Sequence, residues 1–144
     1  RRRALQLSGL PEGFRHELAS CQAAETISEL LDGTNSDLVL HLIASHHGHA
    51  RPFAPIVLDE DPPDLEVTSR GVAERLTTEQ RRALVPPHRL DSGLPERFWR
   101  LTRRYGWWGL AYIEAMLRLA DWEASERHEK ALWATNAGST EKLA

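Results

Sequence analysis

Four residues could together bind a metal ion: His16, the adjacent pair His46 and His47, and Asp121 late in the chain. Neutral imidazole nitrogens combined with a carboxylate oxygen suit manganese, nickel, cobalt, iron or zinc better than calcium, which prefers oxygen ligands. A transition metal held this way can activate water for hydrolysis. The spacing alone is not specific, because a single histidine or aspartate is more often an ordinary surface residue.

The histidine pair ends an apolar segment that starts at Asp37. Apolar residues occur on nearly every side of this segment, which predicts a helix buried in the middle of a bundle. Because Gly48 and Pro52 follow, we expect His46 and His47 in the last turn of the helix and the next residues in a loop. Such a helix would present two imidazoles on a rigid support.

Other helical segments surround this one. Helical periodicity predicts a helix over residues 14–31, with His16 near its start, or two helices with a break near residues 21–24, and helical signals also occur over residues 71–76. Asn35 or Ser36 is the expected N-cap of the central helix, and Thr77 with Gln80 predicts the capping box of a short helix. A further pattern stops at Gly106, and a long helix is predicted from residue 107 to about 127. On that helix Asp121 is expected at the edge of the apolar face, beside a polar stripe that contains Glu114 and Arg118.

Length and composition predict a soluble protein with a single domain. Residues 1–144 are enough for a single domain with a real core, and the pattern predicts an all-α fold with an irregular, proline-rich insert at about residues 53–70. A single cysteine and the lack of a membrane-length apolar run predict a cytoplasmic protein without a membrane partner. The net charge of −3 lacks the strongly basic field of proteins that grip duplex DNA by charge alone.

The order of motifs resembles a known family. Arg15-His16-Glu17, then His46-His47-Gly48 after a buried helix, then Ala120-Asp121-Trp122-Glu123 resemble the HD nuclease domain of the CRISPR-associated helicase-nuclease of type I systems. The resemblance spans residues 14–125. It implies an HD-domain-like helical bundle that cuts single-stranded DNA exposed by the CRISPR surveillance complex. It also implies two divalent transition metal ions, one held by His16, His46 and His47 and the other partly by Asp121, with His46, His47 and Asp121 as the catalytic residues.

The chain departs from that family in one respect. The family is named for an adjacent His-Asp pair, whose aspartate bridges the two metals, and it has a further histidine upstream. Here no histidine is followed by aspartate, and none precedes His16. We expect both elements before Arg1, in a longer protein that also carries a helicase domain; a split protein or a degenerate domain are the alternatives. Without a bridging carboxylate three imidazoles would hold at most one ion weakly, so little nuclease activity is expected of these residues alone.

Several nearby residues have candidate roles in substrate binding. His49 and Arg51 follow the pair and could contact a substrate phosphate, although such loop residues are often only solvated. Trp99, Trp107 and Trp108 could stack on bases, and core packing explains them equally well.

His41 is expected on another face of the central helix, as a satisfied core histidine or as support for the pair.

Two other functions remain open from the sequence. One is an HD-type nucleotide phosphohydrolase, because the same metal chemistry hydrolyses small phosphate esters. The other is a helical interaction module that has lost metal binding. An open groove around His46 and His47 would favour a polymeric substrate, and a closed pocket would favour a mononucleotide.

Overall fold

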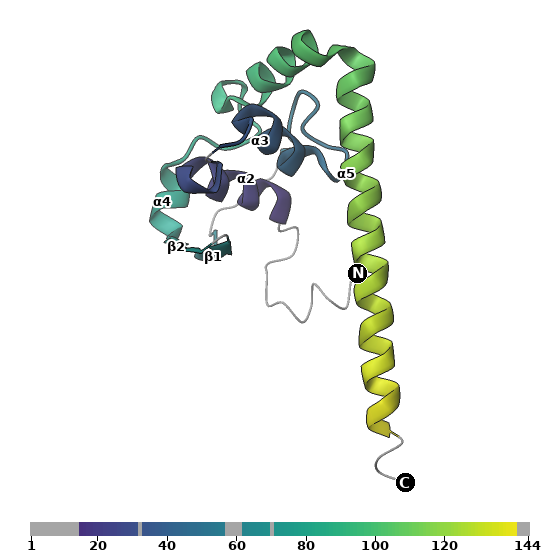
Figure 1. Cartoon of the computed structure of the whole chain (residues 1–144). Coiled ribbons are helices and arrows are strands. Elements are labelled where there is room, and N and C mark those ends of the chain that lie inside the picture. The colour runs from purple at the N-terminus through teal and green to yellow at the C-terminus, as the bar shows by residue number, and fades with distance from the viewer. Residues whose placement is uncertain (1–14, 32, 57–61, 70, 141–144) are drawn as a thin grey trace.

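The computed structural model describes residues 15–31, 33–56, 62–69 and 71–140. It is mostly helical, with 65% helix and a small two-stranded hairpin. Figure 1 shows two short helices, α2 and α3, between the hairpin with α4 on one side and the long helix α5 on the other. In chain order the elements are α2 (His16–Thr26), the 3₁₀ turn η1 (Ser28–Leu31), α3 (Ser36–Ser45), β1 (Leu65–Ser69), β2 (Val72–Leu76), α4 (Thr78–Ala83), η2 (Leu90–Ser92) and α5 (Leu94–Thr140).

α3 is the central helix, as the sequence predicts. Asn35 is its N-cap and accepts a hydrogen bond from the Leu38 amide at 3.3 Å. The Asn35 amide also donates to the Tyr105 hydroxyl at 3.0 Å, which joins the start of α3 to α5. Within the described ranges, no helix is both long and apolar enough to cross a bilayer.

The apolar core joins α2 to α3 and α3 to α5. On the α2 side, the Cys21 thiol donates to the Leu40 carbonyl at 3.7 Å. Burial raises the pKa of Cys21 to about 12, so the thiol stays protonated and unreactive at neutral pH. The first cluster contains Leu18, Cys21, Ala24, Leu40, Ala44, Ala50, Ala54 and Leu94, and the second contains Phe98, Leu101 and Leu110.

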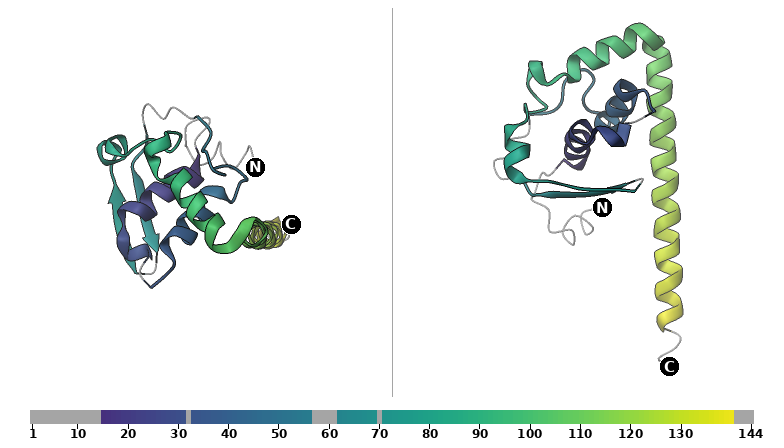
Figure 2. Two further views of the ribbon diagram at one scale, coloured as in Figure 1. Left: turned by 90° about the horizontal axis from the view of Figure 1, so that it is seen from above. Right: turned by 60° about the vertical axis from the view of Figure 1, so that its left-hand side comes forward.

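α5 bends at Gly106, where the sequence predicts a stop. The φ of 70° and ψ of 167° at this residue are not helical, and glycine adopts a positive φ without steric cost. The second half of α5 runs beside the α2–α3 pair and then extends past the hairpin (Figure 2). It continues to Thr140 rather than ending near residue 127, and ion pairs at i, i+4 spacing support the extension. These pairs are Glu123–Arg127 at 2.5 Å and Glu126–Lys130 at 2.7 Å.

The prediction of an all-α fold is confirmed in part, because the described residues are mostly helical but include a small two-stranded hairpin. The prediction of helical structure over residues 71–76 is wrong, because β1 and β2 form an antiparallel hairpin that pairs Leu65 with Leu76. Part of the supposedly irregular insert, residues 65–69, is therefore a strand. Apolar and polar residues alternate in β1 over residues 65–68, and this period of two is typical of a strand. The sequence of β2, Val-Ala-Glu-Arg-Leu, does not alternate, so its strand conformation depends on pairing with β1. Residues 53–56 and 62–64 have no regular structure, and residues 57–61 lie outside the described ranges.

Ion pairs fix α5 against the two short helices. Asp37 of α3 accepts two hydrogen bonds from Arg100, both at 2.9 Å, and lies 3.7 Å from Arg97. Arg97 is buried and also pairs with Glu25 of α2. The hydrogen bonds from Arg100 hold the pKa of the Asp37 carboxyl below its usual value.

This pKa shift predicts how stability depends on pH. Asp37→Asn should lower the free energy of unfolding at pH 7 by about 0.5–1 kcal/mol, a small value because the pair is partly exposed to solvent. Because the pKa is lowered in the folded state, the contribution is present above about pH 4 and disappears as the pH falls through the folded-state pKa. Urea unfolding at pH 7 and at pH 3 measures the difference. Glu74→Gln, an exposed carboxylate on β2, is the control, and equal losses in both variants at pH 7 would contradict the assignment.

Candidate metal centre

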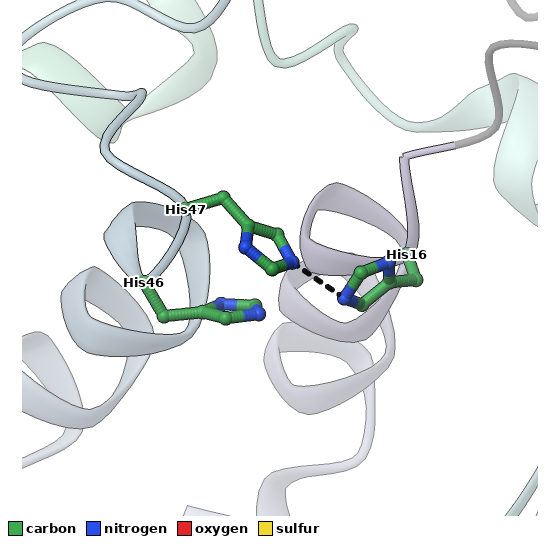
Figure 3. A group of neighbouring side chains, drawn as sticks. All are labelled: His16, His46 and His47. Atoms are coloured by element: carbon green, nitrogen blue, oxygen red, sulfur yellow. Dashed lines mark hydrogen bonds between the residues drawn. The ribbon is translucent and has the colours of Figure 1, made fainter. Parts of the chain in front are cut away.

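Three of the four predicted metal ligands lie together. His16 is the first residue of α2, His46 is the C-cap of α3, and His47 follows it. The pair therefore lies just beyond the last helical residue, Ser45, rather than in the last turn. Figure 3 shows the start of α2 beside the end of α3, with the three imidazoles directed into the space between them. We refer to His16, His46 and His47 as the three-histidine cluster.

The distances within the cluster are short. The Nε2 atoms of His16 and His47 are 2.9 Å apart, and the ring centroids of His46 and His47 are 4.0 Å apart. One ring nitrogen from each histidine lies within 4.8 Å of the other two. Nitrogen ligands of a tetrahedral zinc ion, each at 2.0–2.1 Å from the metal, are about 3.3 Å apart. Small side-chain rotations would therefore bring all three nitrogens to one ion.

A backbone hydrogen bond determines which nitrogen of His46 faces the cluster. Nδ1 lies 2.7 Å from the Ile43 carbonyl oxygen. A carbonyl can only accept a hydrogen bond, so Nδ1 carries the proton, and in the neutral ring the lone pair is on Nε2. Protein ligands of metals are commonly oriented by this type of bond.

The buried carboxylate of Glu17 lies next to His16, on the side of the ring that carries Nδ1. The Nδ1 atom of His16 is 3.8 Å from Oε2 of Glu17, which is only 2% exposed, and Nε2 faces His47. Arg15 donates to the other oxygen of Glu17 at 3.2 Å. Arg15 offsets part of the charge of Glu17, but Oε2 is the carboxylate oxygen nearest His16, and it favours a cation at the cluster.

Asp121 does not join the cluster. It is exposed on α5, and its carboxylate is not among the ligand atoms that gather around the three imidazoles. It lies one turn after Arg118, whose Nε donates to the His46 carbonyl at 3.3 Å. α5 therefore passes close to the cluster, and the role of Asp121 as a ligand of a second metal stays a prediction.

Sequence reasoning missed Glu114. The sequence pattern places it on the polar stripe of its helix, but it is buried and accepts hydrogen bonds from Arg51 at 2.5 Å and from His41 at 2.6 Å, when His41 Nε2 carries the proton. His41 is 1% exposed, which confirms the prediction of a satisfied core histidine. The partners of Glu114 are 63 and 73 positions away, so no local pattern could reveal them.

The two predicted substrate residues differ in environment. His49 is exposed in the loop after the cluster and is not part of it. Arg51 uses Nη1 for Glu114 but directs Nη2 towards the Gly48 carbonyl at 3.4 Å. Its second nitrogen therefore lies near the end of α3, and the role of both residues in substrate binding stays a prediction.

Comparisons with protein families, curated proteins and solved structures found no match. The chemistry of the three-histidine cluster is therefore what points to a function.

The buried charges around Glu114 give a stability test. Glu114→Ala leaves the buried His41 and the partly buried Arg51 without their acceptor, and we expect it to lower the free energy of unfolding by about 2–4 kcal/mol. Glu123→Ala, on the same helix but exposed and paired with Arg127 alone among the described residues, should cost less than about 0.5 kcal/mol. Urea denaturation followed by circular dichroism compares them, and similar losses would show that the Glu114 pairs do not fix α5.

Proposed function

We propose that this chain is a metal-dependent nuclease domain that cleaves single-stranded DNA, like the HD nuclease domain of type I CRISPR systems that its sequence resembles. One observation carries the proposal: His16, His46 and His47, from two separate segments, bring ring nitrogens within 4.8 Å of one another. The hydrogen bond between His16 and His47 requires at least one neutral ring, and close imidazoles repel one another when protonated, so a metal ion bound to their lone pairs would stabilise the cluster.

The donor set fits a catalytic rather than a structural metal. Three imidazole ligands leave open coordination positions, as hydrolytic sites require, whereas structural sites are closed by four protein ligands. A bound divalent transition metal would supply Lewis acidity and a hydroxide nucleophile near neutral pH. The chain's own residues would hold the ligands in place: the Ile43 carbonyl orients His46, and the Glu17 carboxylate stands behind His16.

The surface next to the cluster favours a polymeric substrate. Two hollows of about 120 and 270 Å³ adjoin through Arg51, Ala111 and Glu114. The smaller one reaches Ser45, the neighbour of His46, and the larger one reaches Trp107, which is 62% exposed. Two adjoining hollows, one of them lined by an exposed indole, would suit a single strand, whereas a nucleotide phosphohydrolase would enclose its substrate in one pocket.

The resemblance extends the proposal in three ways. A second metal ion would be held in part by Asp121, with the bridging carboxylate supplied from outside this sequence. The CRISPR surveillance complex would deliver the single strand, and a helicase domain of the same protein would feed it to the site. The cytoplasmic location expected from the sequence belongs to the same proposal.

Metal binding tests the central step. We expect isothermal titration of the metal-free protein with Ni²⁺, Mn²⁺ or Zn²⁺ to show one ion per chain, with weaker binding at acidic pH because protons compete for the imidazoles. His47→Ala should weaken metal binding by at least about tenfold, because even the loss of a residue that only hydrogen-bonds a metal ligand typically lowers metal affinity by that factor. His128→Ala removes an exposed histidine of α5 and should bind like the wild type. Equal affinities in both variants would remove the basis of the proposal.

Cleavage of a labelled single-stranded oligonucleotide tests the activity itself. We expect slow cleavage by the metal-loaded protein, since the bridging carboxylate is missing from this sequence, and loss of cleavage with chelator or in His47→Ala. His128→Ala should retain it. Faster hydrolysis of mononucleotides would favour the phosphohydrolase. If the wild type were no more active than His47→Ala on any of these substrates, the nuclease proposal would fail.

A further inference from the structure

The hollow of about 120 Å³ beside the end of α3 has an unusual charge distribution. Its walls include Arg51 and Arg118, which contribute two guanidinium groups, and one carboxylate, Glu114. That carboxylate is already shared by Arg51 and His41. Among the described residues, Arg118 makes no ion pair, and its one hydrogen bond goes to the neutral carbonyl of His46. The hollow therefore carries excess positive charge.

Both guanidinium groups converge over Gly48. A Cβ atom on this glycine would lie 2.8 Å from Nη2 of Arg118 and 3.5 Å from Nη2 of Arg51. Gly48 has a φ of 87° and no side chain, which leaves room for the two groups at the end of α3. Two like charges this close repel each other, and an anion placed between them would relieve the repulsion and accept hydrogen bonds from both.

The hydroxyl of Ser45 is the third element of this site. Ser45 lines the same hollow, is 2% exposed, and its oxygen has no hydrogen-bond partner among the described residues. A buried hydroxyl without a partner costs free energy, and such groups often mark a ligand or ion position. Ser45 directly precedes His46, so an acceptor bound here would lie next to the three-histidine cluster.

We propose that Arg118, Arg51 and Ser45 form a phosphate subsite next to the three-histidine cluster. The ligand class is a phosphate monoester or diester, because two planar guanidinium forks and a hydroxyl match the tetrahedral oxygens of that group. Its use in positioning a phosphodiester of single-stranded DNA rests on the proposed function. The subsite itself is built from side chains that need no metal.

Inorganic phosphate is therefore a suitable probe for the full chain freed of metal by chelator. We expect isothermal titration at constant ionic strength to show saturable binding of one phosphate. Arg118→Gln should weaken it by about tenfold, because a hydrogen bond to a charged group is lost, and Arg118→Lys should bind with intermediate affinity since it keeps the charge without the fork. Arg103→Gln removes the same charge from an exposed position of α5 and should change the affinity less than about twofold.

Ser45→Ala is a second test of the phosphate subsite, for use if the Arg118→Gln protein does not fold. Removing an unpartnered buried hydroxyl should leave the unfolding midpoint unchanged or higher, and we expect phosphate affinity to fall by about threefold. The subsite is refuted if the wild type shows no saturable binding, or if Arg103→Gln weakens binding as much as Arg118→Gln. Normal metal binding together with either result would leave the proposed function standing. Phosphate binding without metal binding would instead leave the subsite and refute the metal centre.

Discussion

The packing of α2 against α3 is the constraint on which the rest of the candidate site depends. Small residues at this contact, Cys21, Ala24 and Ala44 among them, allow the two helix backbones to approach closely. The start of α2 then lies beside the end of α3, and His16 meets His46 and His47 across this junction (Figure 3). Two helix ends, each fixed by a buried face, position the imidazoles more firmly than a loop would.

The electrostatics of this junction are mixed. The C-terminal end of α3 carries partial negative charge and favours a cation near His46, whereas the N-terminal end of α2 carries partial positive charge and opposes one. The Glu17 carboxylate in the first turn of α2 offsets that opposition, and it lies 3.8 Å from His16. The sequence motif Arg15-His16-Glu17 thus has a physical explanation: the histidine places an imidazole in the three-histidine cluster, and the neighbouring glutamate makes the electrostatic potential there more favourable for a cation.

Local signals in the sequence predicted local features well. Asn35 is the N-cap of α3, Thr77 and Gln80 form the capping box of α4, and Gly106 interrupts α5, each as its residue type requires. Side chains that depend on distant partners could not be found this way. The hairpin strand 72–76 resembled a helix until its partner strand was known, and Glu114 looked like a surface residue because Arg51 and His41 are remote in the chain.

Glu114 also explains why the two arginines meet beside the cluster. By pairing with His41 of α3 and with Arg51 of the following loop, Glu114 fixes which residues of α5 lie against the end of α3. Arg118 lies four residues further along α5, which is one helical turn on the same face, and so reaches the His46 carbonyl and Gly48. The position of a positive charge beside the imidazoles is thus determined by a buried carboxylate one turn away. The buried contacts of Glu114 with His41 and Arg51 are costly to break, and the three residues come from three segments of the chain. The same contacts therefore fix both the position of α5 and the position of Arg118 beside the cluster.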